Sequence, residues 1–164
     1  MYNLIVYGSL INKKELKNEG ISLNNVELVK VYGFKRVFNQ EPSYRFVNSV
    51  NRAVLNIEEE KASWFNAIVI KNLSDKYFET LNKRERGYFQ MLLDDDCVKT
   101  YSNTSISNCV VYKGKLENRD NKIMPNLDYL EICLEGVESF GKEFIHDFIR
   151  TTFKNSKKGW ISIN

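Results

Sequence analysis

The chain has 164 residues, of which 43% are hydrophobic and 27% are charged. This length is enough for one hydrophobic core, and the composition is that of a globular domain, which excludes disordered, collagen-like and repeat proteins. Basic side chains outnumber acidic ones by 24 to 21, which leaves a net charge of +3. Because so small an excess is a poor basis for holding phosphate backbones, we expect no nucleic-acid partner. We expect a single domain over residues 1–164.

The start of the chain and its cysteines favour a cytoplasmic protein. Residues 1–7 are apolar but short, and they lack the basic start and the cleavage site of a signal peptide. No stretch approaches the roughly 18 apolar residues that a membrane helix requires, so we expect no membrane partner. Cys97, Cys109 and Cys133 are odd in number and widely spaced, which favours three reduced thiols.

The N-terminal segments predict a buried strand followed by a short helix. Residues 2–7 are largely apolar and run into a turn at Gly8 and Ser9. Residues 12–19 are polar and suit a short helix that ends at Gly20, because glycine readily adopts the conformation that closes a helix.

Strands are predicted for the next part of the chain. Residues 26–38 are rich in Val, Tyr and Phe and indicate a strand with a bulge at Gly33. Residues 52–57 and 64–70 indicate two further strands, which we expect to form a hairpin around the charged turn at residues 58–61.

A helix is expected to begin after Ser74, a residue type that favours N-caps, and to end near Glu85, before Gly87. Residues 88–93 and 108–112 then indicate two more strands.

The chain changes character after Pro125. Apolar residues recur at helical spacing and predict two consecutive helices, with Gly136 and Gly141 as punctuation. Residues 154–159 indicate a polar connector, and residues 160–163 a closing strand. Because strands precede helices, the class is α+β, and we expect a small mixed β-barrel with flanking α-helices.

Two segments carry candidate chemistry, and the first is the end of the N-terminal strand. Here Tyr7 runs into Gly8, Ser9 and Leu10. Glycine lets the backbone turn sharply, and the successive N–H groups can then hold a carboxylate or another anion. The same residues also suit a plain turn.

The second segment is the helix end at residues 81–88, where Glu85 stands among Lys83, Arg84 and Arg86. One interpretation is a solvated helix end, whose basic residues suit the helix dipole. The other is a partly desolvated Glu85 at the mouth of a cavity, able to take and return a proton.

Taken together, these segments resemble the γ-glutamylcyclotransferase-like superfamily, which includes AIG2-like and ChaC-like proteins. Residues 7–10 are similar to its YGSxL or YGTL loop. Residues 81–88 resemble its Leu-Asp-x-x-Glu-x-x-Tyr segment, in the Arg-Glu form of ChaC-like members, and residues 125–129 resemble its Pro-Ser-x-x-Tyr helix start. The three motifs occur in the family's order, so the resemblance spans nearly the whole chain.

The resemblance implies an enzyme of this fold that uses no cofactor and no metal. In this family the α-amino group of a γ-glutamyl unit attacks its own side-chain carbonyl, which gives 5-oxoproline and releases the attached peptide or amine. Glutathione is one such substrate. By resemblance Glu85 is the catalytic acid/base, and the substrate-binding residues are Tyr7, Gly8, Ser9, Leu10, Tyr88 and Tyr129. We expect a small-molecule γ-glutamyl substrate as partner, and a monomer or homodimer.

The chain departs from the family pattern at two positions. Asn82 stands where the family usually has Asp, and Asn126 stands where it usually has Ser, although Asn caps a helix equally well. The loop also lacks the extra Asn of many glutathione-cleaving relatives, which leaves the substrate open. The alternative is a small-molecule-binding or interaction domain of the same fold that has lost the chemistry. An enzyme acting on a larger acylated substrate is a further alternative.

Other polar residues favour surface roles. We expect His146 on the exposed side of the last helix, because no Ser or Cys partner has motif support. The acidic run at residues 94–96 fits no EF-hand spacing and is interpreted as an exposed strand end. The lysines within residues 154–158, near Trp160, favour a solvated connector over an RNA contact.

Overall fold

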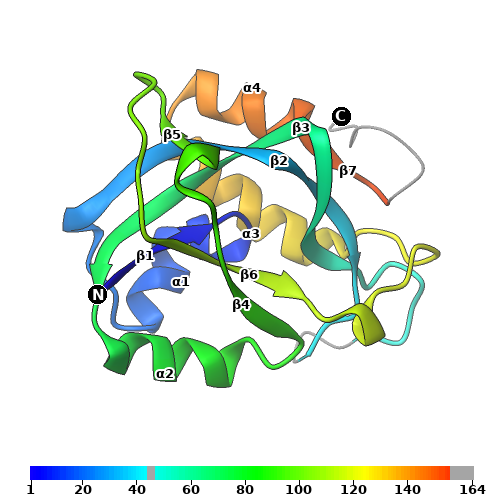
Figure 1. The fold of residues 1–164 in the computed structure, drawn as a ribbon. Coiled ribbons are helices and arrows are strands. Elements are labelled where there is room, and N and C mark those ends of the chain that lie inside the picture. The colour runs from blue at the N-terminus through cyan, green and yellow to red at the C-terminus, as the bar shows by residue number, and fades with distance from the viewer. Residues whose placement is uncertain (44–46, 156–164) are drawn as a thin grey trace.

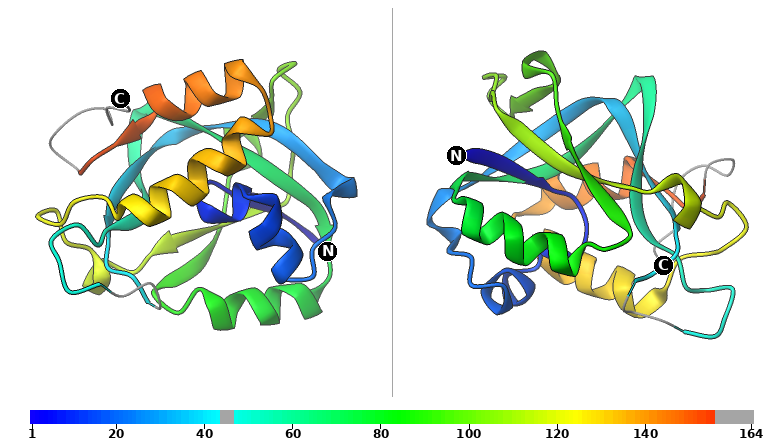
Figure 2. Two further views of the ribbon diagram at one scale, coloured as in Figure 1. Left: turned by 180° about the vertical axis from the view of Figure 1, so that it is seen from behind. Right: turned by 60° about the horizontal axis from the view of Figure 1, so that its bottom comes forward.

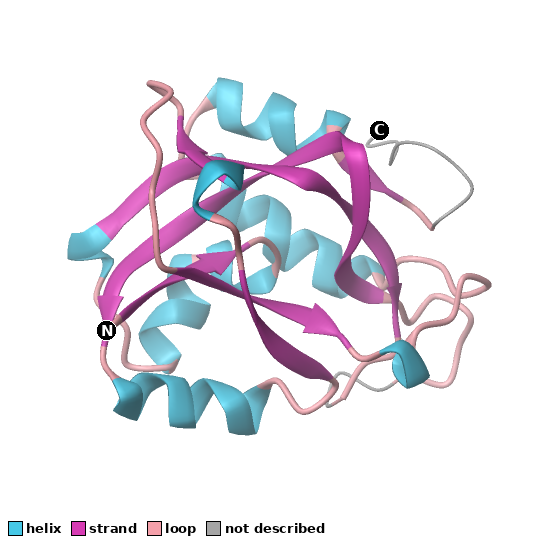
Figure 3. Ribbon diagram, in the orientation of Figure 1, coloured by secondary structure: helices cyan, strands magenta, loops and turns pink. Residues whose placement is uncertain are grey.

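The computed structural model describes residues 1–43 and 47–155, and within them seven strands form one mixed sheet flanked by four α-helices (Figures 1 and 3). The strands are β1 (Tyr2–Val6), β2 (Val26–Gln40), β3 (Val54–Leu73), β4 (Tyr88–Leu92), β5 (Val98–Thr100), β6 (Cys109–Gly114) and β7 (Thr152–Phe153). The helices are α1 (Lys13–Asn18), α2 (Asp75–Arg84), α3 (Leu127–Glu138) and α4 (Lys142–Arg150).

The strand order is β4-β6-β1-β3-β2-β5, and β7 also pairs with β2. β1 runs parallel to β6 and β7 runs parallel to β2, whereas the other pairs are antiparallel. The long strands β2 and β3 curve together over the core (Figure 2). The predicted α+β class is confirmed. The sheet curves as in a barrel but does not close, because no pairing joins the outer strands β4 and β5 in the part of the chain that the structure describes.

β1 lies inside the sheet, with β3 on one side and β6 on the other. Leu4, Ile5 and Val6 are at most 4% exposed. A strand covered on both faces reads as a continuous apolar run instead of an alternating one, which is the pattern found here. The turn that follows β1 therefore begins inside the hydrophobic core.

The hairpin predicted around residues 58–61 is wrong, because these residues lie inside the single 20-residue strand β3. The hairpin partner of β3 is β2, with Lys35 opposite Glu58. The Lys35 ammonium lies 3.8 Å from the Glu58 carboxylate and 3.4 Å from that of Glu60. The charges therefore form cross-strand pairs on a ribbon and do not mark a turn. The bulge predicted at Gly33 is confirmed by its φ of +90° and by a register shift beside it.

The helices predicted near the start and middle of the chain are confirmed as α1 and α2. Asn12 caps α1, since its side chain accepts a 2.9 Å hydrogen bond from the amide of Lys14. Ser74 precedes α2 as expected, but its side chain makes no capping hydrogen bond. α2 ends at Arg84, which makes Glu85 its C-cap residue.

The two predicted C-terminal helices are confirmed as α3 and α4, which lie on the same side of the sheet (Figure 2). Gly141, with a φ of +96°, separates them. Gly136 lies inside α3, where a Cβ would come within 2.8 Å of the backbone of Ile11 and Asn12. Glycine there lets α3 approach the turn after β1 closely. The strand expected at residues 160–163 lies outside the described residues.

Candidate active site

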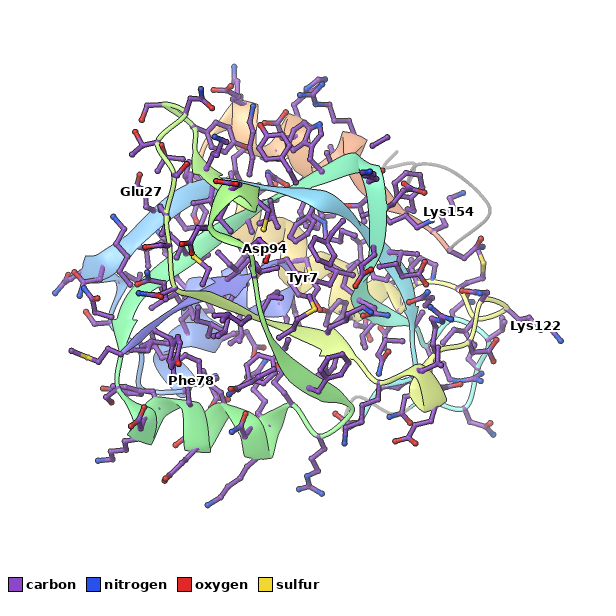
Figure 4. The ribbon with its side chains drawn as sticks, in the orientation of Figure 1. Tyr7, Glu27, Phe78, Asp94, Lys122 and Lys154 are labelled. Atoms are coloured by element: carbon purple, nitrogen blue, oxygen red, sulfur yellow. The ribbon has the colours of Figure 1, made fainter. Side chains whose placement is uncertain are left out.

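A cavity of about 570 Å³, its open mouth included, lies where the turn after β1 meets the end of α2 and the start of α3. Residues that are far apart in the sequence line it: Ile5, Val6, Tyr7, Gly8, Ser9, Leu10, Pro42, Ser43, Val54, Leu55, Glu85, Tyr88, Tyr112 and Tyr129. The seven residues predicted for the site from the motifs are all among them. Figure 4 shows Tyr7 near the middle of the molecule.

The turn after β1 is a single tight 3-10 turn, Ser9–Ile11. The Ile11 amide donates to the Gly8 carbonyl and the Asn12 amide donates to the Ser9 carbonyl, both at 3.0 Å. The first N–H groups of a helical turn have no partner within it, so the amides of Ser9 and Leu10 are left for another acceptor. Both residues line the cavity. This geometry can hold an anion such as a carboxylate.

Glu85 is placed by the end of α2. Its amide donates a 2.8 Å hydrogen bond to the Leu81 carbonyl, and its own carbonyl accepts a 3.0 Å hydrogen bond from the Tyr88 amide. The Glu85 side chain is only 17% exposed and lines the cavity. Its carboxylate lies 3.7 Å from the Arg84 guanidinium. A carboxylate that is fixed by a helix end and partly desolvated is suited to exchanging protons with a bound molecule.

The aromatic walls of the cavity are held by hydrogen bonds to backbone carbonyls. The Tyr7 hydroxyl donates to the carbonyl of Tyr112, and the Tyr88 hydroxyl donates to the carbonyl of Leu55, each at 2.6 Å. Burial, with Glu85 nearby, raises the pKa of Tyr7 well above its usual value. Burial also raises the pKa of Tyr129, with smaller effects from Cys133, Tyr7 and Glu85. Both phenols are therefore neutral at physiological pH.

Tyr112 lines the cavity but was not predicted as a site residue. Its hydroxyl donates a 2.7 Å hydrogen bond to the side-chain oxygen of Asn82, which also accepts from the Gln90 amide at 2.8 Å. No local motif distinguishes Tyr112 from the other aromatic residues of the strands. Its link to Asn82, three residues before Glu85, is visible only in three dimensions.

Asn126, the second departure from the family pattern, keeps the expected cap. Its side-chain oxygen accepts a 3.1 Å hydrogen bond from the Tyr129 amide. Because Asn caps a helix as well as Ser does, the start of α3 is intact, and Tyr129 projects from its first turn. The Tyr129 ring packs edge-on against Phe38, with the ring centroids 6.1 Å apart.

Arg36 is a buried cation that contacts the turn lining the cavity, and the motifs did not indicate it. It is fully buried on β2 and donates to the carbonyl of Tyr7 at 3.3 Å and to the carbonyl of Asn66 at 2.5 Å. Further hydrogen bonds join it to the side chain of Asn66, the carbonyl of Phe148 and the hydroxyls of Thr151 and Thr152. Burial lowers its pKa to about 9, so it remains protonated at neutral pH. No local signal could have indicated it, because an arginine in a strand favours an exposed position and the groups that surround Arg36 come from distant segments.

The remaining polar candidates lie away from the cavity. His146 is exposed on α4, and residues 94–96 are exposed at the turn after β4. Cys97, Cys109 and Cys133 are free thiols, as expected. Lys154 is half-buried, and the other lysines of the predicted connector lie outside the described residues. In the part of the chain that the structure describes, no group of three or more His, Cys, Asp and Glu side chains is arranged to hold a metal ion. Among the described helices, none has the length and hydrophobicity needed to cross a membrane.

Several solved structures share this fold. The protein YkqA from Bacillus subtilis aligns with a TM-score of 0.70 and 14% identity, over 88% of this chain and 51% of its own, so the chain spans about half of YkqA. A structure named gamma-glutamyl cyclotransferase aligns with a TM-score of 0.66 and 15% identity, over 98% of this chain and 93% of its own. A gamma-glutamyl cyclotransferase specific to glutathione from yeast aligns with a TM-score of 0.61 and 14% identity, over 92% of this chain and 94% of its own.

No protein-family model and no curated protein sequence matches the chain significantly. The structural alignments, at identities of 14% to 15%, establish the fold. The chain has the γ-glutamylcyclotransferase-like fold, which confirms at the level of fold the resemblance drawn from the three motifs.

Proposed function

We propose that this chain is a γ-glutamyl cyclotransferase that releases 5-oxoproline from a γ-glutamyl peptide or amine, with Glu85 as the general acid/base. The observation that carries the proposal is that Glu85 lines the same cavity as the turn at residues 7–10. These are the two segments that the reaction requires in one place, because one holds the substrate and the other moves its proton.

The reaction is an internal exchange of one amide for another. The α-amino nitrogen of the γ-glutamyl unit attacks the side-chain carbonyl carbon of the same unit, and a new C–N bond closes the five-membered ring. The bond from that carbon to the leaving nitrogen then breaks. No water, oxidant or metal is consumed. Because nucleophile and electrophile belong to one molecule, the protein need only fold the substrate and manage its protons.

Glu85 manages the proton in this scheme. The substrate amine is an ammonium at neutral pH and must lose a proton before its nitrogen can attack. The Glu85 carboxylate takes that proton and gives it to the leaving nitrogen as the bond to that nitrogen breaks. The second proton, which the ring nitrogen loses as it becomes an amide, passes through the same carboxylate to the released amine, so the enzyme ends the cycle in its starting state. A side chain that is 17% exposed suits this role, since partial desolvation strengthens its interaction with the ammonium.

The turn after β1 and the tyrosines hold the γ-glutamyl unit. The amides of Ser9 and Leu10 are suited to binding its α-carboxylate. Gly8 leaves room for the Tyr129 hydroxyl, which brings that aromatic side chain against the turn. Tyr88 and Tyr129 form aromatic walls that exclude water from the reacting atoms, and burial keeps the Tyr129 phenol neutral by raising its pKa.

The leaving group is open to several chemistries. Glutathione is one substrate to test, because one structural neighbour is a cyclotransferase specific to glutathione. The turn of this chain lacks the extra Asn found in many glutathione-cleaving relatives. γ-Glutamyl dipeptides and γ-glutamyl amines therefore belong in the same panel.

The test is direct detection of 5-oxoproline. The protein is incubated with glutathione, γ-glutamyl dipeptides and γ-glutamyl amines, and the product is quantified by mass spectrometry. Glu85→Gln, which keeps the size of the side chain and removes its basicity, is the matched variant, and we expect its rate to fall at least about 100-fold. Equal product from the two proteins would refute the role of Glu85.

The absence of product from every substrate would refute the cyclotransferase proposal. Calorimetric binding of a non-cleavable γ-glutamyl analogue by such an inactive protein would then support the alternative, a binding domain of the same fold.

A further inference from the structure

We propose that Arg84 is a positioning residue for Glu85. Its guanidinium interacts with the Glu85 carboxylate and also with two carboxylates at the end of α1, those of Glu15 and Glu19. The catalytic consequence rests on the proposed function, whereas the electrostatic link does not. Arg84 is thereby a control point for the protonation of Glu85, set by residues that do not line the cavity.

The geometry places Arg84 between the two halves of the site. Its guanidinium lies 3.7 Å from the Glu85 carboxylate and donates a 3.3 Å hydrogen bond to the hydroxyl of Ser9. Ser9 lies in the turn after β1, and Glu85 caps α2. One side chain therefore touches both the proposed carboxylate-binding turn and the proposed acid/base.

The same guanidinium is anchored on α1. It lies 2.7 Å from the carboxylate of Glu19 and 3.1 Å from that of Glu15. These residues are four apart, so they stand on one face of the helix end and grip the planar fork of Arg84 together. α1 and α2 lie side by side in Figures 1 and 2, and this cluster joins them.

Partial burial strengthens the electrostatic interactions among these four side chains. The side chain of Arg84 is 10% exposed, and those of Glu15, Glu19 and Glu85 are between 17% and 19% exposed. Partly buried charges interact more strongly than surface charges, because water screens them less. One cation faces three carboxylates here. The repulsion among the carboxylates therefore offsets part of the stabilisation that Arg84 gives to the charged form of each.

Three phenols among the described residues also act on Glu85. Tyr7 after β1, Tyr112 of β6 and Tyr129 of α3 each interact electrostatically with Glu85, and burial is the first cause of the raised pKa of each. These phenols are uncharged in the neutral range, whereas Arg84 is a cation 3.7 Å from the Glu85 carboxylate, so its removal changes the charge beside Glu85.

The opposing signs give the proposal its test. Arg84→Met removes the cation and leaves three carboxylates together, so the Glu85 carboxyl should take up its proton at higher pH than in the wild type. The double variant Glu15→Gln/Glu19→Gln removes the competing anions and should displace the same titration to lower pH. Arg84→Lys keeps the charge without the fork, so its titration should lie between those of the wild type and Arg84→Met.

The measurement is an NMR titration of protein labelled with ¹³C at the glutamate carboxyl carbons, with the Glu85 signal assigned by its loss in Glu85→Gln. Arg86→Met is the matched control, because Arg86 flanks Glu85 on the other side and its guanidinium is exposed and bonded to the Lys83 carbonyl. We expect the control to titrate as the wild type does. Folding of each variant is checked by circular dichroism.

Displacements of opposite sign in Arg84→Met and in the double variant support the proposal. A folded Arg84→Met whose Glu85 signal titrates as in Arg86→Met overturns it, and so does a displacement of the same sign in both variants. If Arg84→Met does not fold, the double variant and Arg84→Lys decide by the same criterion.

This readout requires no turnover, so the two proposals fail separately. An inactive wild type with displaced titrations would remove the cyclotransferase and leave the Arg84 link standing. An active wild type, together with variants in which Glu85 titrates at the same pH as in the wild type, would support the cyclotransferase and refute the Arg84 link. In an active protein, the acid limb of kcat/KM should follow the displacement of the Glu85 titration, which a merely structural role of Arg84 would not produce.

Discussion

The hydroxyl of Tyr129 occupies the place where a side chain on Gly8 would begin, closer than non-bonded atoms can approach. Gly8 follows β1 at the start of the chain, and Tyr129 stands in the first turn of α3. The two residues thus fix how α3 meets the turn that lines the cavity, and a methyl group at Gly8 cannot be added without moving one of them.

We therefore predict that Gly8→Ala is destabilising, and that Tyr129→Phe relieves much of the cost. The next nearest atoms to the added methyl are Leu55 Cδ1 and Tyr129 Cζ, both at 3.6 Å, which is ordinary contact. Gly8→Ala alone should lower the free energy of unfolding by about 1–3 kcal/mol, as overpacking does.

A double-mutant cycle in urea measures the relief. The cost of Gly8→Ala should be smaller in the Tyr129→Phe background by at least about 0.5 kcal/mol. An equal cost in both backgrounds would show that the hydroxyl is not the obstacle.

Asn82, where the family usually has Asp, should tolerate that Asp. In its hydrogen bonds to the described residues, Asn82 uses its side-chain oxygen, which accepts from the Tyr112 hydroxyl and from the side-chain amide of Gln90. A carboxylate accepts both hydrogen bonds, whereas a leucine accepts neither. We predict that Asn82→Asp keeps kcat/KM close to the wild-type value and that Asn82→Leu lowers it about fivefold, the equivalent of one hydrogen bond of roughly 1 kcal/mol.

The measurement is the rate of 5-oxoproline formation by the two variants on the best substrate of the panel. A severe loss in Asn82→Asp together with wild-type activity in Asn82→Leu would contradict the assignment. If the expected rates are found, Asn in place of the family's Asp is no evidence for lost activity, because the side-chain oxygen that orients Tyr112 is present in both residues.

The parts of the site that could be predicted from sequence are those carried by short contiguous motifs. The turn from Tyr7 to Leu10 and the helix end at Glu85 can each be recognised from residues that are adjacent in the chain, and both line the cavity. Tyr112 could not be found in this way. It follows an apolar run in β6 as an ordinary strand residue would, and what distinguishes it is a hydrogen bond to Asn82, 30 residues earlier.

The parts of the fold that were predicted wrongly or missed have the same origin. The charged run at residues 58–61 has the composition of a turn, and only its pairing across to β2 reveals a strand. β5 and β7, with three and two residues, are too short to show any periodicity. An arginine in a strand indicates an exposed position, yet Arg36 is fully buried, because carbonyls and hydroxyls from distant segments converge on it.

Arg36 should be important to stability in spite of the cost of burying its charge. None of the hydrogen bonds that it makes to the described residues goes to a carboxylate, so its replacement leaves no opposite charge stranded among them. It does leave the carbonyls of Tyr7 and Asn66 without the guanidinium, whereas the carbonyl of Phe148 keeps the Thr152 hydroxyl as a donor. Because a buried acceptor without a partner costs about 1–3 kcal/mol, we predict that Arg36→Met lowers the free energy of unfolding by at least about 2 kcal/mol.

Urea denaturation at pH 7 tests this, with Arg36→Lys as the companion that keeps the charge. Lysine cannot reach the same set of acceptors, so it too should be destabilising. A methionine variant as stable as the wild type would show that the desolvation of the charge cancels its hydrogen bonds.

Tyr7 and Tyr129 should make the fold sensitive to alkali. The folded state raises the pKa of both phenols well above the usual value of 10.0, mainly through burial. Unfolded tyrosines therefore ionise first as the pH rises. The stability that these residues contribute is fully present below about pH 10 and is lost above it, at about 1.4 kcal/mol per pH unit for each tyrosine.

We predict that the free energy of unfolding falls more steeply between about pH 9.5 and 11.5 in the wild type than in Tyr7→Phe/Tyr129→Phe, which cannot ionise at either position. The double variant starts lower at pH 8, since the carbonyl of Tyr112 loses the hydroxyl that donates to it. The comparison therefore rests on slopes in urea titrations at several pH values. Tyr77→Phe, on the exposed side of α2, should keep the wild-type slope. Parallel slopes in the wild type and the double variant would mean that the two phenols ionise without unfolding the protein, and that the cavity walls are open to water.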